Sequence, residues 1–479
     1  MNSSIPASVS IRLICQVLLL VLVVCWKSID IKAYEPSPPR RTQFHIAPMQ
    51  GYTNAQTRKM FHLLSPSSVK WTEMEKLDDI FPKTESDDYL FDALEKRLGP
   101  PDKYYDPKNN DSDEANLVLQ LGTNDPQRLR AFVEHTMERY DNIKEINLNC
   151  GCPAIESGGA STYGASLMKD ARLTGQLVEA ARNGLEKIKS AKRPYPDISV
   201  KCRIGVFESD NDMRPLEDSD HEYLKDYVSA IHKNGANHVI LHARPAILSG
   251  LSPVKNRIVP KLDYGFVERI ASEFEGKMDV TLNGGITSLS QLRSLQKNSS
   301  GSSSTISSYM AGRWCLRRPL DLMDVEDLLK EEEWESTTTG SSFSSSLPLI
   351  QNAIEQYLDD AIRIASDSSS RTHKPTLAEL CLPLFLITEQ LKDDYDYEED
   401  EMQEDGSLAE RPILTYDDIE SLYDVLQDGV AQIEEVSNSG KKKKKKQGEI
   451  INFKRLSSSF KSLVGTKVVN KWKRNRAEL

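Results

Sequence analysis

The chain has 479 residues, of which 38% are hydrophobic and 7% aromatic, and its formal net charge is −11 at pH 7. This length exceeds one ordinary domain and accommodates a barrel-sized domain with appendages, while the low apolar content indicates that part of the chain is disordered. The overall charge excludes a uniformly basic surface of the kind that binds nucleic acid without further specialisation.

The charge is unevenly distributed along the chain. From Lys441 to the C-terminus there are 14 Lys and Arg against 2 Asp and Glu, so this segment carries +12 and the rest of the chain carries −23. The protein therefore combines an acidic body with a basic tail. Its seven cysteines are odd in number and scattered, unlike those of a secreted disulfide framework, so reduced thiols are expected.

An apolar run lies near the N-terminus. Residues 11–26, IRLICQVLLLVLVVCW, contain one arginine near their start, and the core Leu13–Trp26 is shorter than the roughly 20 residues that span a bilayer. This pattern favours a signal-peptide core or a short anchor, with a buried helix of the folded domain as the alternative. Residues 1–42 are therefore interpreted as a targeting or anchor segment followed by a linker.

Alternating strand-like and helix-like segments begin at Phe44. Eight segments are apolar and strand-like, in the order FHIAPM, VKWTEM, LVLQLG, IKEINLN, ISVKCRIG, HVILHAR, MDVTLNGG and ISSYMAGR. Amphipathic stretches such as DPQRLRAFVEHTMERY separate most of them. Eight such units predict an α/β fold, a (β/α)8 TIM barrel over residues 43–335, with an insertion at about 76–116 between the second and third strands.

The composition changes after the barrel. A Ser/Thr/Gly run at Ser336–Ser346 ends it. A small helical domain is predicted over residues 347–437, in which the acidic block DDYDYEEDEMQED interrupts segments of helical spacing. Residues 438–479 form a basic tail with interleaved aromatic side chains, and we expect the N-terminal and C-terminal extensions to be disordered.

Polar residues and glycines follow seven of the eight predicted strands. Because the active sites of such barrels lie at the C-terminal ends of the strands, this pattern predicts a site there. The residues in question are Gln50 after strand one, Gln120, Asn149 with Cys152, Lys201 with Arg203, His242, Asn283–Gly285 and Gly312–Arg313.

These groups suit a phosphorylated, electron-rich ligand. Glycines after strands seven and eight let backbone N–H groups approach a phosphate, and Arg313 adds a charged donor. Lys201 and His242 would face the N1–C2=O edge of a reduced flavin, and Gln120 its other polar edge. A capping role for His242 and a buried ion pair for Lys201 are the structural alternatives.

Two cysteines, Cys150 and Cys152, follow the fourth strand. A zinc site needs two further ligands, and neither Cys202 nor Cys315 has a metal-like neighbour, so no metal is expected. A disulfide between Cys150 and Cys152 would close a strained ring. The remaining role for Cys152 is that of a general acid, because a thiol of ordinary pKa, about 8.5, is mostly protonated at pH 7.

Seven motifs carry a resemblance to a known family. IAPMQGYT, WTEM, LQLGTNDP, EINLNCGCP, VKCRIG, LHARPAILSGLSPVKNR and LNGGI occur in the order found in tRNA-dihydrouridine synthases, and the chain resembles the A-type branch from about Phe44 to Arg313. The resemblance implies an FMN-binding barrel followed by a helical tRNA-binding domain. It also implies that NADPH reduces the flavin, that hydride passes from flavin N5 to C6 of a flipped-out uracil in tRNA, and that the turn cysteine protonates C5.

The resemblance implies roles for individual residues. Cys152 is similar to the proton donor, Asn149 to a uracil-edge contact, and Arg203 and Arg257 to substrate-side positions. The FMN-binding positions are matched by Pro48, Met49, Gln50, Gln120, Lys201, His242, Asn283, Gly284, Gly285, Gly312 and Arg313. Val254 departs from the pattern, because the family often has Lys there.

The expected partners are tRNA and NADPH. The helical region lacks an Arg/Lys-rich helix, so the basic tail is expected to contribute to tRNA binding. Membrane contact is expected only through the N-terminal apolar segment, and the chain is expected to be monomeric. A secretory lumen does not suit a tRNA enzyme, so localisation lies between an organelle (plastid or mitochondrion) and a membrane anchor facing the cytosol.

Two other functions remain open from the sequence. One is a flavin-dependent oxidoreductase of a small pyrimidine or another small molecule on the same barrel, which the acidic body favours and the basic tail opposes. The other is an RNA-binding protein that has lost its activity. The presence of Cys152, Lys201, His242 and Arg313 argues against the latter.

Overall fold

The computed structural model describes nine segments of the chain, residues 42–82, 87–99, 117–140, 143–153, 163–187, 196–301, 305–334, 347–366 and 375–401. The predictions for the N-terminal apolar run, the Ser/Thr/Gly run and the basic tail lie outside the described residues. None of the helices in the described segments is both long and apolar enough to cross a membrane.

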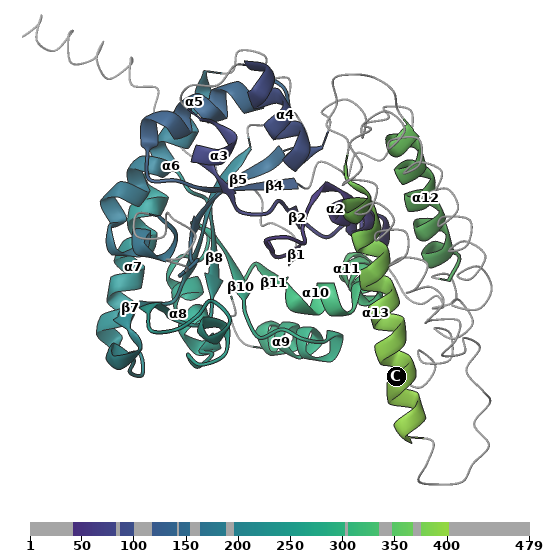
Figure 1. Cartoon of the computed structure of the whole chain (residues 1–479). Coiled ribbons are helices and arrows are strands. Elements are labelled where there is room, and N and C mark those ends of the chain that lie inside the picture. The colour runs from purple at the N-terminus through teal and green to yellow at the C-terminus, as the bar shows by residue number, and fades with distance from the viewer. Residues whose placement is uncertain are drawn as a thin grey trace, which may run out of the picture. The chain divides into compact units, whose positions relative to one another are not determined.

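A parallel sheet curls into a nearly closed barrel (Figure 1). Its strands follow the order β1-β11-β10-β8-β6-β5-β4-β2, with β3 paired to β4, and a parallel bridge between His45 and Val69 joins the two ends. The bounds are β1 (Gln43–Ile46), β2 (Lys70–Trp71), β3 (Glu75–Lys76), β4 (Leu117–Gly122), β5 (Ile143–Cys150), β6 (Asp197–Arg203), β8 (His238–His242), β10 (Asp279–Asn283) and β11 (Ser308–Ala311). The predicted TIM barrel is confirmed.

Helices up to α11 surround the barrel, and α12 and α13 lie to one side of it (Figure 1). Some of them begin at side chains that cap a helix. Asn54 accepts from two backbone N–H groups at the start of α2, and Asp125 precedes Pro126 at the start of α5. The bounds are α2 (Ala55–Leu64), α3 (Leu77–Ile80), α4 (Asp87–Leu98), α5 (Pro126–Met137), α6 (Ala171–Glu186), α7 (Asp218–Lys233), α8 (Tyr264–Glu273), α9 (Leu289–Gly301), α10 (Arg313–Arg317), α11 (Leu322–Trp334), α12 (Leu347–Ser366) and α13 (Leu377–Glu401).

Three details differ from the expectation. The second predicted strand is split into β2 and β3, and the described part of the insertion contains α3 and α4. Two further strands, β7 (Val206–Ser209) and β9 (Ala246–Ser249), pair in parallel as a small separate sheet beyond the ends of β6 and β8. The acidic block does not stop the preceding helix, because α13 continues to Glu401.

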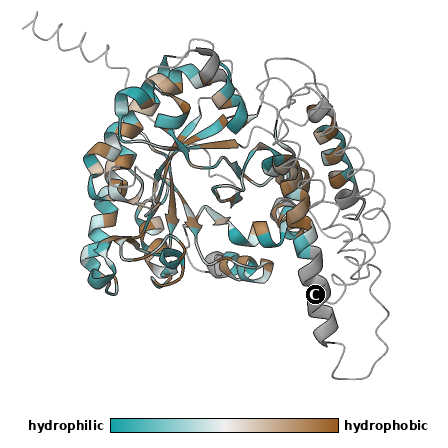
Figure 2. Cartoon of the chain, in the orientation of Figure 1, coloured by the Kyte–Doolittle hydropathy of each residue, from teal (hydrophilic) through white to brown (hydrophobic). Residues whose placement is uncertain are grey.

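The apolar side chains form two clusters. The larger lies between the strands and the helices. Figure 2 shows hydrophobic strands and amphipathic helices, which have hydrophobic residues on one side and hydrophilic residues on the other. The smaller consists of alternate strand residues, which face the barrel interior. It contains Ala47, Val69, Trp71, Val118, Ile240 and Met310. This apolar plug fills one part of the barrel interior, and buried polar side chains of neighbouring strands occupy the rest.

Helices α12 and α13 pack against α2. Tyr357 of α12 donates a hydrogen bond to the Leu380 carbonyl of α13 (2.7 Å), and both helices contribute to the larger apolar core. Gln390 of α13 accepts from the backbone N–H of Leu320 (2.9 Å), which lies in the 3-10 turn after α10. The described helices beyond the barrel are therefore joined to it through its first helix and its C-terminal end.

Candidate active site

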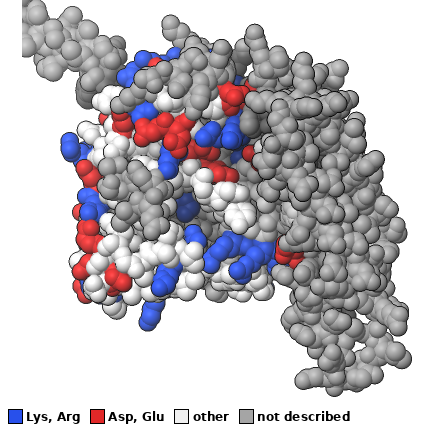
Figure 3. Space-filling model, viewed as in Figure 1, with Lys and Arg blue, Asp and Glu red and all other residues white. Residues whose placement is uncertain are grey.

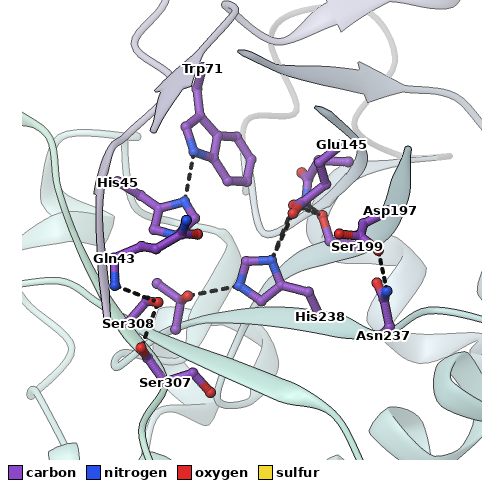
Figure 4. A network of polar contacts seen from close by, with 12 residues as sticks. Gln43, His45, Trp71, Glu145, Asp197, Ser199, Asn237, His238, Ser307 and Ser308 are labelled. Carbon is purple, nitrogen blue, oxygen red and sulfur yellow. Dashed lines mark hydrogen bonds and ion pairs between the residues drawn. The ribbon is translucent and has the colours of Figure 1, made fainter. Parts of the chain in front are cut away.

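A buried carboxylate lies at the base of the barrel (Figure 4). Glu145 of β5 accepts hydrogen bonds from Ser199 of β6 and from Nδ1 of His238 on β8 (3.0 Å), and His238 Nε2 lies 2.7 Å from the Thr281 hydroxyl on β10. Burial by itself raises the pKa of Glu145, but the charge and hydrogen bond of His238 and the Ser199 hydroxyl lower it to about 2. The carboxylate is therefore ionised at neutral pH and links four neighbouring strands.

A chain of side-chain hydrogen bonds rises from this carboxylate. Asn147 donates to the Ser199 hydroxyl (2.7 Å), Gln120 donates to Asn147 Oδ1 (2.8 Å), and Asn149 donates to Gln120 Oε1 (2.9 Å). Because the ionised Glu145 can only accept, Ser199 donates to it, and each amide above is held in one orientation. Each side chain therefore donates to the next one down, from the C-terminal ends of the strands (the mouth of the barrel) toward their N-terminal ends (its base).

The top of this chain fixes the turn that carries Cys152. Asn149 Oδ1 accepts from the backbone N–H groups of Gly151 (3.2 Å) and Cys152 (3.0 Å). The Cys152 carbonyl accepts from Ala165 (2.9 Å), and Gly164, at φ +70°, packs so closely that a Cβ would lie 2.6 Å from that carbonyl oxygen. Cys152 is partly exposed, so its thiol is held at the mouth on a rigid backbone.

The neighbouring Cys150 is in a different environment. It is fully buried, and burial raises the pKa of its thiol to about 12, an effect that the hydroxyl of the adjacent Tyr227 offsets only in part. Both Cys150 and Cys152 are free thiols in the structure. Of the two, only Cys152 offers its sulfur to a ligand.

Lys201 and His242 lie at the ends of β6 and β8. In the described part of the chain, Lys201 makes no hydrogen bond or ion pair, and burial together with Arg203 lowers the pKa of its ammonium to about 8. Burial and the charges of Arg203 and Lys201 hold the pKa of His242 well below 6.5, so its ring is neutral. An ammonium and a neutral imidazole thus share one side of the mouth.

Four arginines complete a positive cluster. Arg203 is buried and donates to the Gly151, Pro245 and Asn256 carbonyls (3.1, 3.3 and 3.2 Å), and Arg244 donates to the Ile258 and Pro260 carbonyls. Arg257 and Arg313 are exposed. Burial and neighbouring charges lower the pKa of Arg203 to about 10, and burial with Arg313 lowers the pKa of Arg257. Figure 3 shows Lys and Arg in and below a central hollow, with Asp and Glu gathered above it.

None of these five cations has a carboxylate partner among the ion pairs of the described residues. The five are Lys201, Arg203, Arg244, Arg257 and Arg313. Uncompensated positive charge in a partly buried hollow is costly and attracts anions. The mouth is therefore built for an anionic ligand.

The remaining predicted ligand positions lie around the same mouth. Gly284, at φ +107°, lies so close under His242 that a Cβ would come within 2.5 Å of the ring. Asn283 donates to the Met310 carbonyl (2.9 Å), and Gln50 donates to Glu73 (2.9 Å). Pro48, Met49, Gly285, Gly312 and Arg313 follow the ends of β1, β10 and β11. The structure therefore brings together the strand-end residues that sequence reasoning selected.

Several functional contacts were not found from the sequence. Arg203 donates to backbone carbonyls, and both ends of the Gln120 amide bond to other amides. The predicted contacts of these two residues with a ligand stay predictions. Glu145, Asn147 and Asn256 were not selected at all. The sequence EINLN in β5 contains a pattern from which Glu145 and Asn147 can be predicted. Its polar residues alternate with apolar ones, and a period of two places all of the polar side chains inside the barrel.

Comparison with known proteins gives a consistent family. The family model described as "Dihydrouridine synthase (Dus)" matches residues 45–382. A tRNA-dihydrouridine(20/20a) synthase of Shewanella oneidensis is 30% identical over 289 residues, which cover 60% of this chain and 71% of that protein. The protein of the same name from Pasteurella multocida is 28% identical over 327 residues, covering 67% and 84% of the two chains. That from Escherichia coli K12 is 31% identical over 288 residues, covering 59% and 68%.

Proposed function

Since the chain belongs to the dihydrouridine synthase family, we propose that it reduces uridine to 5,6-dihydrouridine in tRNA. FMN is the hydride carrier and NADPH the reductant in this proposal. The single observation that carries it is the cluster of five uncompensated cations at the mouth, three of which, Lys201, Arg203 and Arg257, lie near the partly exposed thiol of Cys152. The relatives' shared name, tRNA-dihydrouridine(20/20a) synthase, supports the choice of substrate.

The residues at the mouth fit FMN. Its phosphate is a dianion, and Arg313 with the backbone beyond β10 and β11 offers the charge and close approach that a phosphate needs. Lys201 and the neutral His242 match an electron-rich, hydrogen-bonding ring edge, because both lack a protein hydrogen-bond partner among the described residues. Bound FMN would supply the hydride.

The protein's own residues position a proton donor for the uracil. Asn149 holds the Cys152 turn through two backbone N–H groups, so the thiol keeps one position relative to the ends of β5 and β6. Cys152 then donates its proton to C5 of the uracil, and the thiolate formed is stabilised by the nearby positive charges of Lys201 and Arg203. The same cluster attracts the phosphates that flank the target base.

Incubation of the purified protein with NADPH and a tRNA transcript tests the proposal directly. We expect dihydrouridine in the tRNA nucleosides after digestion, and none when NADPH is omitted. NADPH oxidation that is stimulated by free uracil or uridine, with no dihydrouridine in tRNA, would instead assign the protein to the small-molecule reductases.

We expect Arg313→Ala to weaken FMN binding by about 10- to 150-fold in Kd, because it removes a charge-assisted phosphate contact of about 1.5–3 kcal/mol. Fluorescence titration of the apoprotein with FMN measures this change. Arg317→Ala is the matched control, since Arg317 is an exposed arginine one turn later in α10. Equal losses in the two variants would show a general charge effect and contradict a specific role for Arg313.

A further inference from the structure

Exposed apolar side chains are concentrated on one turn of the described structure. Val254, Ile258 and Val259 are 55%, 59% and 43% exposed, whereas the other large exposed apolar residues of the described segments, Tyr52, Met213 and Tyr223, are scattered. Single exposed apolar residues are ordinary, but several on six consecutive residues mark an interaction surface. We call residues 254–259 the apolar turn.

The apolar turn is helical. The backbone N–H of Arg257 donates to the Val254 carbonyl (3.0 Å). The backbone N–H groups of Ile258 and Val259 both donate to the Lys255 carbonyl (2.9 and 2.8 Å). Val254 and Ile258 are four residues apart, so they share one face, and Asn256 lies on the opposite, buried side. The turn thus presents aliphatic side chains to solvent and a polar anchor to the protein.

Three side chains hold the turn in place. Both ends of the Asn256 amide bond to the backbone of Ile247 in β9 (2.9 Å each). Arg203 donates to the Asn256 carbonyl (3.2 Å), and Arg244 donates to the Ile258 carbonyl (3.2 Å). A surface that is held in one conformation before binding loses little conformational entropy when a partner docks. Burial of the exposed aliphatic side chains therefore contributes directly to the free energy of binding.

The turn borders the reacting thiol. One guanidinium, that of Arg203, bonds both to the Gly151 carbonyl beside Cys152 (3.1 Å) and to the Asn256 carbonyl of the apolar turn (3.2 Å). Arg257 of the turn is close enough for Cys152 to influence its pKa. The apolar turn therefore lies beside the part of the mouth at which Cys152 is partly exposed.

We propose that the apolar turn is a docking ledge for the unpaired nucleotides beside the target uridine. This inference rests on the proposed function. The cations around the turn, Arg244, Arg257 and Arg313, match a polyanion and would repel the same face of a second copy of this chain. Val254, Ile258 and Val259 cover the faces of bases that lose their stacking partner when the uridine is extruded, as aliphatic wedges do in other nucleic-acid complexes.

Replacing the aliphatic side chains tests the ledge. We expect Ile258→Ser to raise the KM for a tRNA transcript by about five- to tenfold and Val254→Ser/Ile258→Ser to raise it further, because part of an isoleucine's burial is lost. Ile258→Leu, which keeps the aliphatic area, should stay within about twofold of the wild-type KM. The thermal midpoint and the FMN content should match the wild type, since these side chains are exposed.

Salt dependence separates apolar contact from charge. Ile258→Ser should keep the wild-type slope of log KM against log salt, whereas Arg257→Gln should reduce that slope by about one phosphate contact. An unchanged KM in the double serine variant of an enzyme that makes dihydrouridine overturns the ledge and leaves the proposed function standing. The ledge is also overturned if Val254→Ser/Ile258→Ser loses self-association, or loses binding to anionic vesicles, while its KM for tRNA is unchanged. The apolar turn would then bind a second copy of the chain or a membrane. A wild-type protein that forms no dihydrouridine overturns the proposed function itself.

Discussion

Cys152→Ala is expected to slow uracil reduction by about 10²- to 10⁴-fold, which is the usual contribution of a positioned proton donor. The turn should survive the change, because Asn149 holds the backbone N–H of Cys152 and not its side chain. Reduction of bound FMN by NADPH should proceed as in the wild type, since that half-reaction needs no proton at C5 of uracil. Single-turnover experiments with pre-reduced enzyme and tRNA measure the affected step separately.

Cys150→Ala is the matched control for this thiol. Cys150 is two residues away, but its sulfur is buried beside Tyr227, where burial raises its pKa to about 12. We expect a small loss of stability from the lost volume and a near-normal single-turnover rate. If the two alanine variants lost activity equally, Cys152 would not be the specific proton donor and the two sulfurs would have to act as a pair.

Glu145→Leu is expected to lower the free energy of unfolding by about 2–6 kcal/mol, because it leaves two buried hydrogen-bonding groups without their acceptor, at a cost of about 1–3 kcal/mol each. The variant leaves His238 Nδ1 and the Ser199 hydroxyl without their acceptor at the base of the barrel. Urea denaturation monitored by tryptophan fluorescence measures the change. Glu145→Gln, which keeps an oxygen acceptor for Ser199, should lose less.

The pH dependence of this effect has a defined sign. The pKa of Glu145 is about 2 in the folded protein against an ordinary value of 4.5, so the ionised form is favoured by folding and contributes about 3 kcal/mol. This contribution is fully present above about pH 4.5 and is lost as the pH falls toward 2. The difference in unfolding midpoint between wild type and Glu145→Gln should shrink over that range, and a constant difference would contradict an ionised Glu145.

The sequence by itself determined the barrel and the place of its site. Eight apolar segments alternating with amphipathic ones admit few folds, because parallel strands must be buried on both faces and joined by crossovers. Once the barrel is inferred, the residues after its strands converge at one mouth by geometry alone. That is why Cys152, Lys201, His242 and Arg313, which lie far apart in the chain, can be assigned to one site from the sequence alone.

Only the tertiary structure decided which of these residues bond to other side chains and to the backbone of the protein. Gln120 and Asn147 are 27 residues apart and Arg203 and Asn256 are 53 apart, so their hydrogen bonds depend on the register of neighbouring strands and on the path of a loop. Register is set by closure of the whole barrel and by packing around its apolar plug, and no local pattern contains it. Cys150 and Cys152 are two residues apart in the sequence, and the fold buries the first thiol and leaves the second partly exposed.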